Sequence, residues 1–142
     1  MQRVFGAGGV IDSFVSQRLD RLIDRDGPVW RWVRDDPLTA GLPARWDAFV
    51  GHKEAVQALP PGCVHLVAAE PCPFQMIRWG RNVYATQFHP EADARDFEQR
   101  IRIYRDHGYF PPETAEDLIA TCHAASVTIP GEILRRFAER YG

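Results

Sequence analysis

The stretch "FQMIRWGRNVYATQFHPE", residues 74–91, holds two short apolar runs and a polar ending. Gly80 and Arg81 separate the two runs, which predicts a β-hairpin with a tight turn. In the second arm, successive side chains alternate between the two faces of the predicted strand. Strands commonly end at Gly, Asn or Ser, but this arm ends at His89, a proline and Glu91. The ending therefore suggests a functional corner of the sheet.

The flanking sequence predicts an α/β domain in which short strands are followed by packed helices. Residues 63–69, "CVHLVAA", form a further strand candidate. Apolar residues recur at helical spacing in the segments 92–108, 114–122 and 131–141. Residues 11–23, "IDSFVSQRLDRLI", show the same spacing and predict an N-terminal helix.

The bulk composition fits one soluble domain, because the chain has 142 residues, of which 45% are hydrophobic and 25% charged. The formal charge of −2 predicts no nucleic acid or anionic membrane partner. No apolar run approaches the roughly 18 residues that a membrane span needs. The N-terminus lacks the form of a signal peptide. An odd and sparse count of three cysteines fits the reduced thiols of a cytoplasmic protein.

Several other chemistry-bearing residues have structural interpretations. Cys63 and Cys72 are expected to be small buried side chains, and with His65 they lack the paired spacing of a zinc site. No metal and no cofactor is therefore predicted. His65 itself is expected to be satisfied within the core. The basic residues after the polar corner are interleaved with acids and predict a solvated helix face; they are Arg95, Arg100, Arg102 and Arg105.

The tripeptide His-Pro-Glu admits a catalytic and a structural interpretation. An imidazole is a good general base near neutral pH when another group orients it, and a carboxylate on Nδ1 fixes the tautomer. Pro90 restricts both itself and His89, so a tight turn could bring Glu91 back toward the ring. The alternative is that the proline and the acid simply begin a helix.

Residues 51–91 carry three sequence blocks, "GHKEAVQALPPG", then "CP", then "YATQFHPE". In this order and at these separations, the blocks closely resemble class I glutamine amidotransferases, especially the glutaminase domain of GMP synthetase and its stand-alone relatives. The preceding "DPLTAGLPARWDAF" resembles the segment that comes before these blocks in that family. The resemblance thus covers residues 36–91 and extends into the helix that follows.

The resemblance implies a three-layer α/β sandwich of the class I glutamine amidotransferase type, of which this chain would hold the C-terminal portion only. Residues 1–142 would form a partial amidotransferase domain, with a core portion over 1–110 and a C-terminal helical tail over 111–142.

The resemblance also implies a reaction, which is hydrolysis of the side-chain amide of glutamine by a Cys–His–Glu triad. The expected partners are glutamine and a synthetase or other ammonia acceptor. By resemblance, His89 is the catalytic base and Glu91 is the carboxylate that orients it. Gln2, Gly51 and His52 match positions that contact the substrate.

The nucleophile of that triad has no counterpart in the expected place. In the family it lies in a "G.C.G.Q" elbow well upstream of the histidine, but no cysteine precedes Cys63 here. Met1 and Gln2 resemble the end of such an elbow, so we expect the nucleophile to be encoded upstream of Met1 and residues 1–142 alone to be inactive. Two alternatives remain open: a non-catalytic remnant that binds a partner or ligand, and a related γ-glutamyl amide hydrolase.

Overall fold

The computed structural model describes residues 2–3, 15–21, 36–51, 54–56, 58–69 and 72–142. Its described strands are β1 (Gln2–Arg3), β2 (Val15–Arg21), β3 (Arg45–Val50), β4 (Glu54–Ala55), β5 (Cys63–Ala68), β6 (Met76–Trp79) and β7 (Val83–Thr86). The described helices are α2 (Ala94–Tyr104), the short 3-10 helix η2 (Pro112–Thr114), α3 (Ala115–Ala124) and α4 (Ile129–Tyr141).

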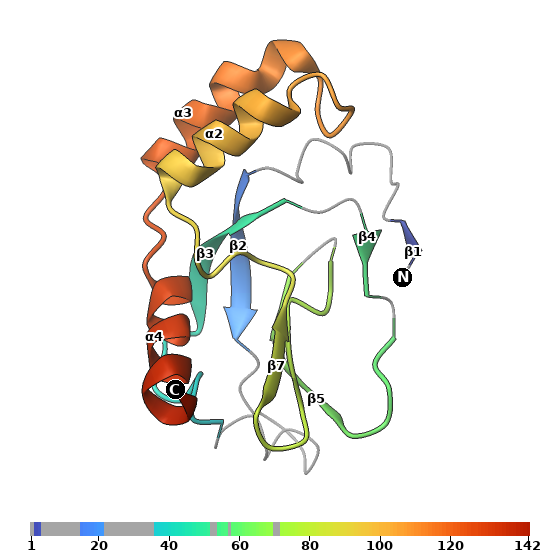
Figure 1. The fold of residues 1–142 in the computed structure, drawn as a ribbon, viewed down its shortest axis with the longest axis vertical. Helices are drawn as coiled ribbons and strands as arrows, with labels where there is room; N and C mark the ends of the chain where they lie inside the picture. Colours follow the sequence, from blue (N-terminus) through green and yellow to red (C-terminus); the bar gives the residue numbers. More distant parts are fainter. Residues whose placement is uncertain (1, 4–14, 22–35, 52–53, 57, 70–71) are drawn as a thin grey trace.

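The main sheet has the strand order β3-β2-β5-β6-β7, and every neighbouring pair in it is antiparallel. The pair β1 and β4 forms a separate small ladder. Figure 1 shows α2 and α3 lying together at one end of the sheet, while α4 lies beside β3. Short strands followed by helices are thus present as the sequence predicts.

The segment from Val15 to Arg21 is the strand β2, so the helix predicted over residues 11–23 is wrong there. β2 pairs with β3 from Val15 opposite Val50 to Asp20 opposite Arg45, and it pairs with β5 on its other side. Apolar residues four positions apart, such as Val15 and Leu19, fit both a helical and a strand period. Sheet partners on both sides decide between the two. The rest of the predicted helix lies outside the described residues.

The predicted hairpin is present as β6 and β7. Trp79 pairs with Val83, and the loop between them contains Gly80, Arg81 and Asn82. Gly80 has a φ of 62°, a left-handed conformation that glycine adopts without a steric cost. The far end of the hairpin, where Met76 pairs with Thr86, lies next to the polar corner.

Side chains of β3 alternate between two hydrophobic cores on opposite faces of the sheet. Trp46, Ala48 and Val50 enter a core on the α4 side, whereas Phe49 enters a core built by α2 and α3. The α4-side core also contains Leu38, Leu42, Leu66, Val67, Ala69, Met76, Phe88 and Ile133. The α2–α3-side core also contains Phe97, Ile101, Phe110, Ala115, Leu118, Ile119 and Cys122. Helices therefore cover β3 on both faces, which confirms the expected layered α/β fold.

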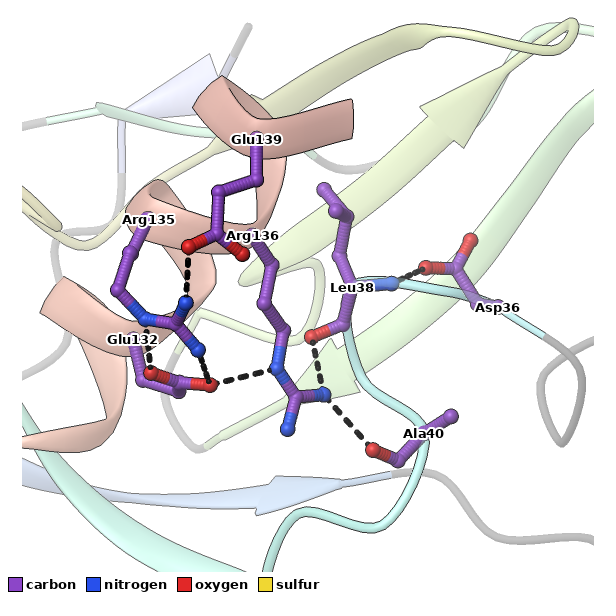
Figure 2. A network of polar contacts seen from close by, with 7 residues as sticks. All are labelled: Asp36, Leu38, Ala40, Glu132, Arg135, Arg136 and Glu139. Atoms are coloured by element: carbon purple, nitrogen blue, oxygen red, sulfur yellow. Dashed lines mark hydrogen bonds and ion pairs between the residues drawn. The ribbon is translucent and has the colours of Figure 1, made fainter. Parts of the chain in front are cut away.

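A polar network joins α4 to the turn at residues 36–41 (Figure 2). Arg136 donates through Nη1 to the carbonyls of Ala40 at 2.7 Å and Leu38 at 3.3 Å, and through Nε to Glu132 at 2.8 Å. The neighbouring Arg135 contacts only acids of α4, Glu132 and Glu139, among the contacts drawn in Figure 2. Arg136 therefore links the turn to α4, whereas Arg135 forms ion pairs within α4.

Candidate active site

The polar corner, residues 89–91, lies where the chain leaves β7 and crosses to the end of β3. Phe88 forms an isolated antiparallel bridge with Val50. The backbone N–H of His89 then donates to the carbonyl of Phe49 at 2.9 Å. The corner is thus held by backbone bonds to β3, a strand whose side chains enter both cores.

His89 and Glu91 meet directly, because Nδ1 of the ring lies 2.9 Å from Oε1 of the carboxylate. This contact is the one expected from the sequence. Burial acts to raise the pKa of Glu91, but hydrogen bonds from its own backbone, from His89 and from Arg100 outweigh it. The net pKa of Glu91 is therefore lowered, which favours the ionised carboxylate as the acceptor of a hydrogen bond from Nδ1–H of His89.

The helix after the corner begins without help from Glu91. The N-cap of α2 is Asp93, whose Oδ1 accepts from the backbone N–H groups of Arg95 at 2.8 Å and Asp96 at 2.9 Å. Asp96 returns the interaction, since its Oδ2 accepts from the N–H of Asp93 at 2.9 Å. The interpretation of His-Pro-Glu as a helix start is therefore wrong, and Glu91 is available to the ring of His89.

Two buried phenylalanines support the imidazole. Phe97, on the first turn of α2, meets the ring of His89 at a centroid distance of 5.4 Å and an angle of 64°. Phe97 stacks in turn on Phe49 of β3 at 4.9 Å. The ring of His89 therefore rests on Phe97, which Phe49 supports in turn, and both phenylalanines belong to the α2–α3-side core.

Arg100 reaches the same pair from α2. Its Nη2 donates to Oε1 of Glu91 at 3.0 Å, while its Nη1 lies 3.0 Å from Nδ1 and 3.4 Å from Nε2 of His89. The interpretation of the arginines as a solvated helix face is therefore wrong for Arg100. A sequence signal existed, because Arg100 follows Phe97 by three positions and so shares its helix face.

The predicted substrate positions are only partly described. Gly51 directly follows β3, one residue past the bridge between Val50 and Phe88. The backbone of Gln2 pairs with Ala55 in the β1–β4 ladder. His52 lies outside the described residues. The structure thus places Gly51 near the corner in the sheet, and it describes only the backbone of Gln2.

Gln87 connects the polar corner to a neighbouring segment, a role that the sequence analysis did not assign to it although it lies within the block "YATQFHPE". Its side-chain Oε1 accepts from the backbone N–H of Val56 at 3.0 Å, and its own backbone N–H donates to the carbonyl of Gln75 at 2.8 Å. Val56 follows β4, so Gln87 connects the corner to the segment after Gly51. A half-buried glutamine two residues before a histidine carries no recognisable signal of this role in a single sequence.

The three cysteines lie away from the imidazole or are inaccessible. Cys72 and Cys122 are fully buried, and burial raises the pKa of the Cys72 thiol to about 11. Cys63 pairs with Trp79 at the turn end of the hairpin, whereas His89 follows the opposite end of β7. Nε2 of His65 lies 2.8 Å from the carbonyl of Pro73 and 3.0 Å from that of Val67, as a structural histidine would.

No family model matches the chain. GMP synthase [glutamine-hydrolyzing] of Thermosipho melanesiensis is 37% identical over 70 residues, which are 49% of this chain and 14% of that protein. The glutamine-hydrolysing GMP synthase subunit of Archaeoglobus fulgidus is 30% identical over 77 residues, covering 54% of this chain and 41% of that protein. The chain resembles part of a class I glutamine amidotransferase of the GMP synthase kind.

The amidotransferase-like fold extends beyond the region of sequence identity. A crystal structure of a glutamine amidotransferase from Thermotoga maritima superposes with a TM-score of 0.62 at 21% identity. That superposition covers 92% of this chain and 50% of the other. The α/β amidotransferase fold predicted from the sequence is therefore confirmed for the part of the domain that this chain represents.

The described part of this amidotransferase-like chain offers neither a metal-binding cluster nor a membrane span. Among the described residues, no group of three or more His, Cys, Asp or Glu side chains is placed to hold a metal ion. No described helix has both the length and the apolar character needed to cross a bilayer.

Proposed function

We propose that this chain supplies the histidine and carboxylate of a site that hydrolyses the side-chain amide of glutamine. His89 is the general base and acid, and Glu91 orients it. The observation that carries this proposal is the 2.9 Å contact between His89 Nδ1 and Glu91 Oε1 at the end of β7. The similarity to glutamine-hydrolysing GMP synthases supports the choice of substrate.

In the proposed reaction, His89 keeps its proton on Nδ1 and donates a hydrogen bond from it to Glu91, so the Nε2 lone pair is free to take a proton from a thiol. The thiolate attacks the amide carbon of glutamine, and the ring returns the proton to the departing nitrogen, which leaves as ammonia. A thioester remains. Water then attacks it, His89 accepts the proton of that water, and glutamate and the thiol are released.

The thiol comes from a polypeptide segment other than residues 1–142. Cys72 and Cys122 are fully buried, and Cys63 lies at the opposite end of the hairpin from His89. The proposal therefore assigns to this chain the proton-transfer half of the site and not the nucleophile.

The proposal extends to substrate contacts and partners. Gly51, His52 and Gln2 border the glutamine, with Gly51 following directly on β3. The released ammonia passes to a synthetase partner in the cytoplasm; the similar Archaeoglobus fulgidus protein is itself named as one subunit of a GMP synthase. In this proposal, residues 1–110 form the core portion of a partial amidotransferase domain, and residues 111–142 form its C-terminal helical tail.

Two preparations test the function: the chain of 142 residues, and the protein isolated from its natural host, each assayed for ammonia release from glutamine. The chain alone should release no more ammonia than its His89→Ala variant. Host protein carrying His89→Ala should lose at least about a thousandfold in rate, and Glu91→Gln should lose less, because it retains a hydrogen-bond acceptor. Arg105→Gln, on the same segment but without a described contact to the site, is the control.

Two outcomes would contradict the proposal. If the His89→Ala variant of the protein isolated from its natural host hydrolyses glutamine as fast as the unaltered protein, another residue is the base. Host protein that is inactive on glutamine but cleaves γ-glutamyl amides, or binds glutamine without turnover, would establish one of the alternative functions instead.

A further inference from the structure

The contacts of Arg100 with the polar corner are too short and too many for a solvated side chain. One guanidinium touches the carboxylate of Glu91 and both ring nitrogens of His89. Its Cζ also lies 5.4 Å from the centroid of Phe97, the ring that supports the imidazole. Arg100 thus contacts every described side chain that orients His89, apart from Phe49.

The two distances from Nη1 to the ring locate the guanidinium. Nη1 lies 3.0 Å from Nδ1 and 3.4 Å from Nε2. A donor aimed in the ring plane at the Nδ1 lone pair would be far from Nε2, and an in-plane position close to both nitrogens would collide with Cε1. Nη1 therefore lies over the face of the imidazole, where a planar guanidinium stacks favourably.

This placement decides between two arrangements of the Nδ1 proton. A guanidinium has only donors, so Nη1 could bond to Nδ1 only if that nitrogen carried no proton. A carboxylate has only acceptors, so the 2.9 Å contact with Glu91 requires the Nδ1 proton. Because Nη1 lies over the ring face, the in-plane position at Nδ1 is left to Glu91, whose Oε1 accepts from both Nδ1 and Nη2.

We propose that Arg100 is a positioning residue for the proposed base: it stacks on the imidazole and holds Glu91 in the ring plane, so that His89 keeps its proton on Nδ1 and presents the Nε2 lone pair. The importance of this for glutamine hydrolysis rests on the proposed function. The positioning itself is a property of the substrate-free chain. Arg100 has no bond to make or break in the reaction.

The test compares Arg100→Gln with Arg100→Lys, which keeps the charge but loses the planar fork, and with Arg105→Gln as the control. Nitrogen NMR of the histidine rings should give the Nδ1–H signature for His89 in the original chain. In Arg100→Gln the signature should move toward the Nε2–H tautomer, and carbon NMR should show the pKa of Glu91 raised. Arg100→Lys should be intermediate, and Arg105→Gln should match the original chain.

These readouts need no activity, so they separate this inference from the function. An unchanged His89 signature and an unchanged Glu91 titration in folded Arg100→Gln would overturn the positioning role, whatever the chain does with glutamine. If Arg100→Gln fails to fold, the same comparison is made with Arg100→Lys. In a preparation that hydrolyses glutamine, Arg100→Gln should lower kcat about ten- to a hundredfold with little change in KM. A change confined to KM would contradict the role.

Discussion

Asp36 is a fully buried carboxyl that joins three parts of the chain. Its Oδ1 accepts from the backbone N–H of Leu38 at 3.0 Å, within the turn at residues 36–41. The hydroxyl of Tyr84 in β7 donates to Oδ2 at 3.3 Å, and Nε of Arg78 in β6 lies 3.5 Å from the same oxygen. Burial raises the pKa of Asp36 above 3.8, although these neighbours act in the opposite direction.

The raised pKa predicts how stability depends on pH. A carboxyl whose pKa is higher in the folded state contributes fully below its unfolded pKa, near 3.8, and loses that contribution as the pH rises through the folded value. Asp36→Asn resembles the neutral acid at every pH. The free energy of unfolding of the original chain minus that of Asp36→Asn should therefore be largest below about pH 4 and should decrease as the pH rises above that value.

Urea titrations of both proteins across this range measure the difference. Asp36→Ala should be less stable than Asp36→Asn at every pH, by about 2 kcal/mol, because it leaves the N–H of Leu38 and the hydroxyl of Tyr84 without their buried acceptor. A difference between original chain and Asp36→Asn that grows with pH would mean that the fold stabilises the ionised carboxylate and not the neutral acid.

At the scale of elements, α4 offers two adjacent arginines with different roles (Figure 2). Arg136 bonds to carbonyls of Leu38 and Ala40, nearly a hundred positions away along the chain. Arg135 bonds to Glu132 and Glu139 of its own helix, at an exposed site. Bonds that join separate elements stabilise the tertiary structure, whereas exposed ion pairs within one helix contribute little.

Arg136→Ala should therefore lower the free energy of unfolding by about 1–2 kcal/mol, and Arg135→Ala by at most about 0.5 kcal/mol. Chemical denaturation of the two variants under the same conditions provides the comparison. Equal losses for both would mean that the helix ion pairs, and not the bonds to the turn, account for the stabilisation.

The elements also show what the sequence could and could not predict. The hairpin followed from Gly80 between two apolar runs, and α2 from Phe97 and Ile101 one turn apart on a helix face. β2 was missed because the spacing of Val15 and Leu19 fits two periods, and only its partners β3 and β5 decide between them.

For the candidate site, the contact of His89 with Glu91 was expected, because two residues separated by a proline can meet through local geometry. Arg100 was missed because its mixed-charge neighbourhood is typical of an exposed face, and its contact depends on where α2 starts. The N-cap residue Asp93 sets where α2 begins. Whether Arg100, two turns later, then reaches His89 depends on how α2 packs against the sheet, which is a tertiary property.

At the scale of the whole molecule, the sheet separates two cores that share no residue. Ile101 lies in the α2–α3-side core and Ile133 in the α4-side core. Ile101→Val and Ile133→Val should each lower the free energy of unfolding by about 0.5–1.5 kcal/mol. Because the sheet lies between them, the double variant should lose the sum of the two within about 0.5 kcal/mol. A larger deviation, measured by equilibrium unfolding, would mean that packing changes pass through β3 from one core to the other.

The bond from the N–H of His89 to the carbonyl of Phe49 has a consequence for the order of folding. Glu91 and Arg100 are close to His89 along the chain, so their meeting closes only short loops and has a small entropic cost. Phe49 is remote in sequence, and its bond forms only when β3 is in place. A partly folded chain could therefore form the contact between His89 and Glu91 before the backbone of β3 is in place to orient His89. The native orientation of His89 would then be among the last features to form.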